Sequence, residues 1–156
     1  LGDVYKRQPI ADLNIKSSVL NPCEVTPGDV PNLIDELPIL FIASCFAEGT
    51  SSFIDIEELK HKESDRLKAM QDGLDKMKIK NFLDGNVFCI KGMGKDYKSP
   101  NFLAETNYDH RIAMSFAIAG LNSDSSIEIA SPESINTSFP EFIELGKKLG
   151  CNFEIS

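Results

Sequence analysis

Two stretches of the chain carry apolar side chains on nearly every face of a helix. The first covers residues 36–47, with Asp35 before it and Gly49 after it. An acidic residue at the start, a proline in the first turn and a glycine after the last turn are typical of helix ends. The second stretch covers residues 111–119 and follows Asp109. We therefore predict two helices buried between other layers, each with its preceding aspartate as the N-cap.

Two further helices are expected to be amphipathic. Between Leu67 and Met77, apolar side chains recur at intervals of three and four residues, which predicts a helix with a narrow apolar stripe. Ser64 precedes this pattern and is the predicted N-cap. The charged run over residues 57–66 is expected to be a loop that leads into this helix. A second amphipathic helix is predicted over residues 139–149.

Short apolar runs between turn signals predict the strands. Residues 79–83 and 86–91 are joined through an Asp-Gly pair, which favours a β-hairpin. Segments 21–31 and 92–106 contain several prolines and glycines and are predicted to be loops. Further strands are expected over residues 11–17, 52–56, 127–129 and 151–155.

The order of these elements occurs twice. The shift of 74 residues that places Asp35 on Asp109 also places the first apolar helix on the second. Each copy continues with a strand, a charged or polar loop, an amphipathic helix and a strand. We therefore predict an α/β fold with two repeated units, over residues 35–108 and 109–156, whose buried helices pack against sheets.

The segment before the first unit is expected to have two parts. Residues 9–34 are interpreted as a strand and a loop that belong to a preceding unit. Residues 1–8 (LGDVYKRQ) differ in character from the rest and are interpreted as a junction sequence foreign to the fold.

Composition narrows the possible functions. The net charge is −8, which argues against a nucleic-acid surface, because neutralising phosphates requires clustered Lys and Arg. No apolar run approaches the ~18 residues of a membrane span, and no secretory signal is recognisable. The four cysteines lie far apart without a CxxC pair, so we expect buried free thiols in the cytoplasm rather than a zinc site or disulfides.

Candidate chemistry gathers at the starts of the predicted helices. Outside residues 1–8 the chain has two arginines, Arg66 and Arg111, and each lies near one of its two histidines, His61 and His110. Helix N-termini favour anions, and the planar charged fork of arginine suits phosphate and carboxylate. With Lys62 these residues would form a cationic patch for an anionic substrate.

Carboxylates next to this patch would be able to move protons. Asp35 and Glu63 are the two we single out for this role. An alternative stays open at this point: a charged run before a helix is commonly a solvated helix start, and an aspartate there is commonly only a cap.

Two motifs make the chain recognisable. Residues 59–67 (LKHKESDRL) are similar to the L-R-V-K-E-S-D-R-L signature of the 5-enolpyruvylshikimate-3-phosphate synthase family, and residues 109–114 (DHRIAM) resemble its second signature. Three supporting blocks match in the same order, at residues 35–38, 46–49 and 137–142. The resemblance runs from about Pro9 to Ser156.

The resemblance implies a fold and a place within a larger enzyme. The family has two domains, each built from three βαβαββ units in the enolpyruvyl transferase manner, and this chain would supply about two units from the C-terminal part. The N-terminal domain would be missing, so we expect the chain alone to be inactive. The complete enzyme is expected to be a cytoplasmic monomer of the shikimate pathway, which leads to chorismate and the aromatic amino acids.

The resemblance also implies a reaction and residue roles. The carboxyvinyl group of phosphoenolpyruvate would pass to the 5-hydroxyl of shikimate 3-phosphate with release of phosphate, without a cofactor or metal. Asp35 matches the proton acceptor for the 5-hydroxyl, and Glu63 matches the acid that handles the proton at the methylene carbon. Lys62 matches a lysine between the two substrates. Arg66 and Arg111 match the two arginines that hold phosphoenolpyruvate. His110 matches the imidazole beside them and is the third expected catalytic residue, with Asp35 and Glu63.

Two departures and two rivals accompany this interpretation. Lys60-His61 replaces the usual Arg-Val, and Thr137 stands where one branch of the family has an active-site lysine. The first rival is UDP-N-acetylglucosamine enolpyruvyl transferase, against which both signatures argue. The second is a non-catalytic binding module of the same fold, against which the intact acid, base and arginine positions argue.

Overall fold

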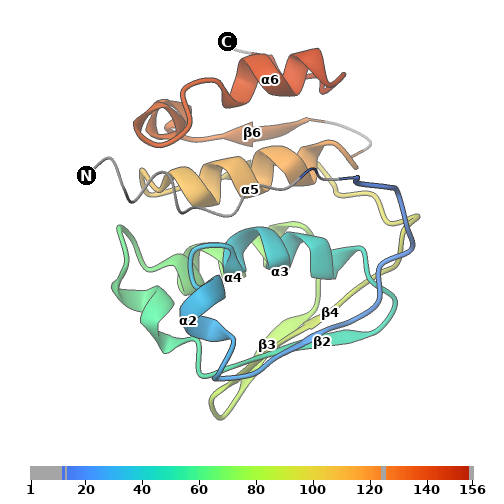
Figure 1. Cartoon of the computed structure of the whole chain (residues 1–156), viewed down its shortest axis with the longest axis vertical. Helices are drawn as coiled ribbons and strands as arrows, with labels where there is room; N and C mark the ends of the chain where they lie inside the picture. Colours follow the sequence, from blue (N-terminus) through green and yellow to red (C-terminus); the bar gives the residue numbers. More distant parts are fainter. Residues whose placement is uncertain (1–11, 13, 124–125, 155–156) are drawn as a thin grey trace.

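A four-stranded sheet forms one side of the protein. The computed structural model describes residues 12, 14–123 and 126–154. The sheet has the order β1-β2-β4-β3, with β1 parallel to β2 and the other neighbours antiparallel. Its strands are Glu24–Val25 (β1), Thr50–Ile54 (β2), Asn81–Asp84 (β3) and Val87–Lys91 (β4). Figure 1 shows the helices on one side of this sheet.

The helices that cover the sheet are the ones that connect its strands. Their bounds are Val30–Leu33 (α2), Leu37–Cys45 (α3) and Arg66–Lys76 (α4), with the 3₁₀ helix Glu57–His61 (η1) before α4. Phe41 of α3 lies edge-on to Phe53 of β2 and Phe88 of β4, with ring centroids 4.7 and 5.0 Å apart. All three side chains are fully buried, so this aromatic cluster joins α3 to the middle of the sheet.

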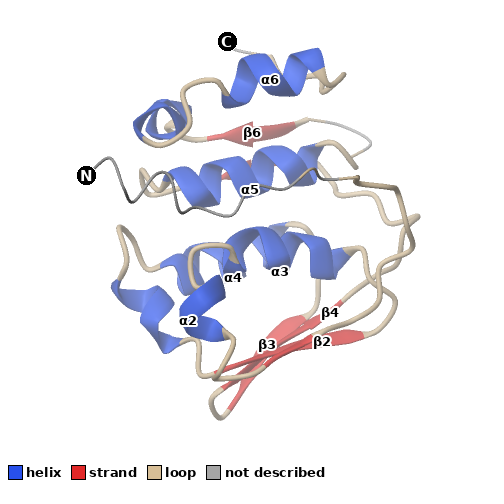
Figure 2. Cartoon of the chain, in the orientation of Figure 1, coloured by secondary structure: helices blue, strands red, loops and turns tan. Residues whose placement is uncertain are grey.

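A smaller two-stranded sheet lies on the other side of the central helices. Its strands, Phe102–Ala104 (β5) and Ile127–Ile129 (β6), are parallel and are connected through helix α5, His110–Gly120. The 3₁₀ helix Pro132–Thr137 (η2) and helix Phe142–Lys148 (α6) follow. Figure 2 shows α5 between the α3/α4 layer and β6, with α6 beyond it.

The helices of the two halves pack closely where they meet. Gly73 of α4 faces the ring of Phe116 of α5, and a Cβ atom on Gly73 would lie 1.9 Å from Cζ of that ring. Phe116 is fully buried. A glycine is therefore required here by the close approach of α4 and α5.

The order of elements recurs in the two halves as far as α6, whereas the strand predicted to end the second copy is not observed in the described residues. The first half runs β1, α2 with α3, β2, η1, α4, β3 and β4, and the second runs β5, α5, β6, η2 and α6. Adding 74 to the bounds of α3 gives residues 111 and 119, inside α5. The same shift places η1 on η2. The first half is a βαβαββ unit, and the second follows the same order as far as α6. The division of the chain at residues 35 and 109 stays a prediction.

Both predicted apolar helices are confirmed, as is the hairpin. α3 and α5 have five or more buried residues each, and the strands at residues 50–54 and 127–129 lie close to their predicted positions. The stripe between Leu67 and Met77 is buried as predicted. All four cysteines are free, but only Cys45 is buried, and burial raises its pKa to about 12.

Several sequence-based predictions were wrong. The segment predicted as a loop over 21–31 contains β1 and the start of α2, and the one over 92–106 contains β5. These strands have two or three residues, too few to show an alternating pattern. The helix predicted over 139–149 begins later, at Phe142.

The two predicted terminal strands are not observed in the described residues. Residues 12, 14–17 and 151–154 have no strand pairing, and the rest of both segments, like residues 1–8, lies outside the described residues. In the part of the chain that the structure describes, no helix combines the length and apolar character needed to cross a membrane.

Candidate functional site

A buried arginine forms the centre of a charged cluster. The side chain of Arg66, the first residue of α4, is 1% exposed. Its Nε donates to Asp109 Oδ2 at 2.8 Å, its Nη1 to Asp35 Oδ1 at 2.9 Å and its Nη2 to Glu63 Oε2 at 2.5 Å. Burial lowers the pKa of Arg66, but the hydrogen bonds to Asp109 and Asp35 and the charges of Asp109 and Glu63 together outweigh it, and the pKa is raised overall. Arg66 therefore stays charged and fixes three carboxylates.

The two residues before Arg66 fix the start of α4. Asp65 is the N-cap and accepts a hydrogen bond from the Lys68 amide, so Ser64 is not the cap that the sequence predicted. The Ser64 hydroxyl instead donates to Asp109 Oδ2 at 3.2 Å. This contact links the start of α4 to the start of α5.

Asp109 joins the buried arginine to a helix N-terminus. Its carboxylate is fully buried, and it is the N-cap of α5, as predicted. Oδ1 accepts from the amides of Arg111 at 2.9 Å and Ile112 at 3.4 Å. Oδ2 accepts from Arg66 and Ser64. A carboxylate without solvent contact requires such a set of donors, because an unpaired buried charge is very unfavourable.

Asp35 has a different role from its counterpart in the second unit. It lies in the turn between α2 and α3, and the N-cap of α3 is Glu36, so the predicted capping role of Asp35 was wrong. Its Oδ1 accepts from Arg66, and its Oδ2 lies 3.4 Å from Arg111 Nη2. The side chain remains 45% exposed. A carboxylate held in place by two arginines and open to solvent has the fixed position and the access that a proton acceptor for a bound ligand requires.

The neighbouring cations keep Asp35 ionised. The hydrogen bond from Arg66 lowers the pKa of Asp35, partial burial opposes this, and the charges of Arg111, Arg66 and Lys62 lower it further. The net effect is a pKa below the ordinary value. Asp35 is therefore a carboxylate at neutral pH.

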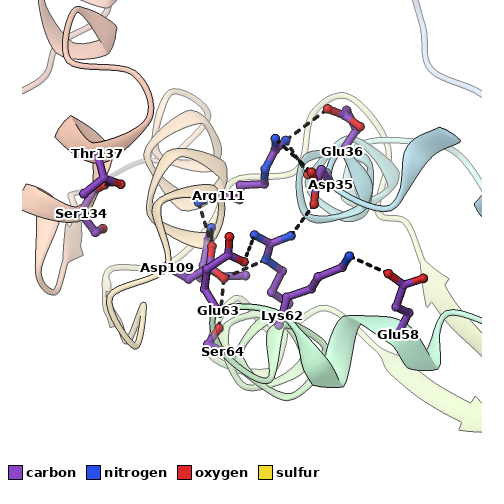
Figure 3. Close-up of polar contacts among 12 residues, drawn as sticks. Asp35, Glu36, Glu58, Lys62, Glu63, Ser64, Asp109, Arg111, Ser134 and Thr137 are labelled. Carbon is purple, nitrogen blue, oxygen red and sulfur yellow. Dashed lines mark hydrogen bonds and ion pairs between the residues drawn. The ribbon is translucent and has the colours of Figure 1, made fainter. Parts of the chain in front are cut away.

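Arg111 reaches back from α5 to the start of α3. Its Nη1 donates to the backbone oxygen of Asp35 at 2.8 Å and to Glu36 Oε1 at 3.1 Å. The side chain is 30% exposed, in contrast to the buried Arg66. Figure 3 shows Arg111, Asp35 and Glu36 meeting between the two helices. The two arginines thus bind Asp35 from the interior and from the surface.

The other predicted site residues lie at the edge of this cluster. Glu63 pairs with Arg66, and its side chain is 55% exposed. Lys62 Nζ pairs with Glu58 at 2.6 Å and points toward it in Figure 3. His110 is the half-buried first residue of α5, between two members of the cluster. Its imidazole has no hydrogen bond to the residues that the structure describes.

Thr137 is separated from this cluster. It lies in η2, where its hydroxyl donates to the backbone oxygen of Ser134 at 2.7 Å. Figure 3 places both residues across α5 from the charged side chains.

Sequence reasoning assigned no site role to four residues that the structure places here. They are Glu36, Glu58, Ser64 and Asp109. Arg66 gave one sequence signal for such partners. An arginine at the start of an amphipathic helix has to pair with carboxylates if the fold buries it. Which carboxylates it finds depends on contacts between α3, α4 and α5.

A groove adjoins the charged cluster. Its volume is about 220 Å³. Its lining includes three charged side chains, one hydroxyl and five apolar side chains: Asp35, Glu36, Arg111, Ser115, Ile39, Met114, Ile118, Phe139 and Phe142. Among the described residues, no group of three or more His, Cys, Asp or Glu side chains is arranged to hold a metal ion.

The fold is that of the enolpyruvyl transferases. The enolpyruvyl transferase NikO from Streptomyces tendae matches 85% of this chain and 28% of its own, with a TM-score of 0.60. At 18% sequence identity this likeness concerns the fold alone.

Closer relatives establish the family. The family model described as EPSP synthase (3-phosphoshikimate 1-carboxyvinyltransferase) matches residues 2–145, and the chain belongs to this family. A solved EPSP synthase from Acinetobacter baumannii matches 88% of this chain and 32% of its own, with 40% identity and a TM-score of 0.82.

Curated relatives agree and are longer than this chain. The 3-phosphoshikimate 1-carboxyvinyltransferase of Zymomonas mobilis is 43% identical over 95% of this chain, and that of Ruthia magnifica is 41% identical over 94%. The chain spans about a third of the length of each, at 33%.

Proposed function

We propose that this chain forms part of an enzyme that transfers the carboxyvinyl group of phosphoenolpyruvate to the 5-hydroxyl of shikimate 3-phosphate. The observation that carries the proposal is the position of Asp35. Its carboxylate is released from helix capping, ionised and held between Arg66 and Arg111. Membership of the 3-phosphoshikimate 1-carboxyvinyltransferase family indicates which substrates this base and these arginines would bind.

The first half of the proposed reaction is an addition. The 5-hydroxyl oxygen bonds to C2 of phosphoenolpyruvate while Asp35 accepts the hydroxyl proton. Glu63 would enter this step as the carboxylic acid and donate its proton to the C3 methylene, which becomes a methyl group. Two proton transfers by positioned side chains avoid a free alkoxide and an unprotected oxocarbenium ion, which is how general acid–base catalysis lowers the barrier.

The second half is an elimination. Glu63 takes a proton back from the methyl group, the bond from C2 to the phosphate oxygen breaks, and an enol ether and phosphate are released. The proton held by Asp35 passes to the departing phosphate. These steps transfer protons and one carboxyvinyl group and change no oxidation state, so the proposed reaction uses no redox cofactor and no metal.

The cations of the site bind the anionic substrates. Arg111 would hold the carboxylate or phosphate of phosphoenolpyruvate, because the guanidinium fork matches both groups. Arg66 would do the same once Glu63, a partner that is 55% exposed, leaves its Nη2. Lys62 would leave Glu58, a partner that is 61% exposed, to stand between the two substrates. His110 would supply the imidazole next to the arginines that hold phosphoenolpyruvate.

The partners follow from the same proposal. Besides the two small substrates, the chain requires the remainder of the enzyme, which would bind shikimate phosphate and close over the reactants. We propose that the complete enzyme is a cytoplasmic monomer of the shikimate pathway and of chorismate and aromatic amino acid biosynthesis.

The test is a phosphate-release assay on the complete enzyme that contains this chain. We expect release from phosphoenolpyruvate that depends on shikimate 3-phosphate. Release that depends on UDP-N-acetylglucosamine would assign the chain to the rival transferase. A folded protein that releases no phosphate with either acceptor would favour the non-catalytic binding module.

A further inference from the structure

Glu36 occupies the N-cap of α3 without capping it. Its side chain accepts no hydrogen bond from the helix amides. N-caps are normally Ser, Thr, Asp or Asn, whose short side chains reach the amides of the second or third helical residue. The second residue of α3 is Pro38, which has no N–H. A capping hydrogen bond therefore does not account for a glutamate here, and the general preference of helix N-termini for negative charge is all that α3 itself provides.

The side chain of Glu36 instead reaches the second unit. Its Oε1 accepts a hydrogen bond of 3.1 Å from Arg111 Nη1, across 75 residues of sequence. The same nitrogen donates to the backbone oxygen of Asp35 at 2.8 Å. Because Nη1 carries two hydrogens, these two acceptors use both of them.

The two contacts fix how the guanidinium of Arg111 is turned. The Nη1 end points at the start of α3, and Nη2 lies 3.4 Å from Asp35 Oδ2. Among the described residues, none accepts a hydrogen bond from Arg111 Nε. The edge formed by Nε and Nη2 is one of the two edges on which arginine binds carboxylate or phosphate with paired hydrogen bonds.

We propose that Glu36 is a positioning residue for phosphoenolpyruvate binding. This role rests on the proposed function. By taking the second hydrogen of Nη1, it turns the Nε–Nη2 edge of Arg111 toward the anionic substrate. Without Glu36, the guanidinium would keep one hydrogen bond at Nη1, to the Asp35 carbonyl, and the longer ion pair of Nη2 with Asp35 Oδ2 at 3.4 Å. Glu36 does not touch the reacting atoms.

The test compares Glu36→Ala and Glu36→Gln in the complete enzyme. Glu36→Ala removes the acceptor, and we expect the KM for phosphoenolpyruvate to rise about tenfold, as for the loss of one hydrogen bond to a charged group, with kcat changed less than threefold. Glu36→Gln keeps an acceptor oxygen and should restore the KM to within about twofold of wild type. Glu144→Ala, which removes an exposed ion pair with Lys148 on α6, is the matched control.

A second measurement separates positioning from stability. The side chain of Glu36 is 53% exposed, so all three variants should unfold at temperatures close to wild type. An unchanged KM in Glu36→Ala would overturn the proposal. So would a lower KM in both Glu36 variants, since that would make Glu36 a competing anion rather than a positioning residue. If the wild-type enzyme itself releases no phosphate with both substrates, the proposed function fails instead.

Discussion

Arg66 Nη1 donates a hydrogen bond of 2.9 Å to Asp35 Oδ1 and so joins a side chain that is 1% exposed to one that is 45% exposed. The contact gives a solvent-accessible carboxylate a rigid anchor within the core. A proton acceptor needs access to its substrate and a fixed position, and this pair of residues provides both.

Asp35→Asn tests the role of this carboxylate. We expect turnover of the complete enzyme to fall about a hundredfold or more, as is usual when a general base is lost. Because Asp35 does not cap α3, a loss of helix stability would not explain such a fall. Steady-state rates should be compared with those of Asp72→Asn, which alters an exposed pair with Lys68 on α4. Turnover of Asp35→Asn within threefold of wild type would refute the assignment.

The two arginines should respond differently to replacement by lysine. Arg66→Lys keeps a charge but loses the fork that holds the buried Asp109 together with the more exposed Asp35 and Glu63. We therefore expect a loss of roughly 2 kcal/mol or more in the free energy of unfolding. Arg111→Lys changes a side chain that is 30% exposed and should leave stability within about 1 kcal/mol of wild type. Urea unfolding measures both.

Both lysine variants should also bind phosphoenolpyruvate more weakly, because a lysine cannot form paired hydrogen bonds with one carboxylate. The KM for phosphoenolpyruvate measures this effect. An unchanged KM in both variants would remove these arginines from the substrate site.

Stability should depend on pH through Asp35. Its pKa in the folded protein lies below the ordinary 3.8, so its ion pairs contribute fully above that value and are lost as the pH falls through the folded pKa. We therefore expect the difference in unfolding free energy between wild type and Asp35→Asn to shrink as the pH is lowered below about 4. Urea titrations at several pH values provide the measurement. A difference that stays constant down to pH 2 would contradict it.

Gly73→Ala probes the contact between the two units. The new Cβ would lie 1.9 Å from Phe116 Cζ, and we expect a loss of about 1–3 kcal/mol or more from overpacking. Gly120→Ala is the matched helical control, because its Cβ would meet Ile127 Cβ at an ordinary 3.7 Å. Thermal unfolding should rank the control at or above wild type. Equal melting temperatures for the two variants would argue against the packing described.

The chain by itself is expected to show no turnover with both substrates. Its cationic groups line one side of a site, and several large apolar side chains are exposed, among them Ile39, Phe139 and Leu145. We therefore also expect self-association in light-scattering measurements. Turnover by the purified 156-residue chain would show that the remainder of the enzyme is not required.

The sequence predicted the long elements of this fold better than the short ones. α3 and α5 are apolar all round because they lie between layers, and such a run stands out in any sequence. β1 and β5 have two and three residues, and their pairing depends on β2 and β6 rather than on their own pattern. Asp35, Glu63, Arg66 and Arg111 were foreseen as site residues, whereas Asp109, Ser64 and Glu36 were not. The contacts could not be foreseen, because Arg66 and Asp109 meet through packing between α4 and α5 across 43 residues.

The two repeated units differ by where a helix begins. Asp109 caps α5 directly, whereas α3 begins two residues after the equivalent Asp35. Because α3 begins later than α5 relative to this aspartate, Asp35 does not cap a helix and its carboxylate is available to a substrate. A duplicated unit can thus gain a reactive group without gaining a new amino acid. In an engineered copy, lengthening the turn before α5 would be a direct way to ask whether a second such carboxylate can be created.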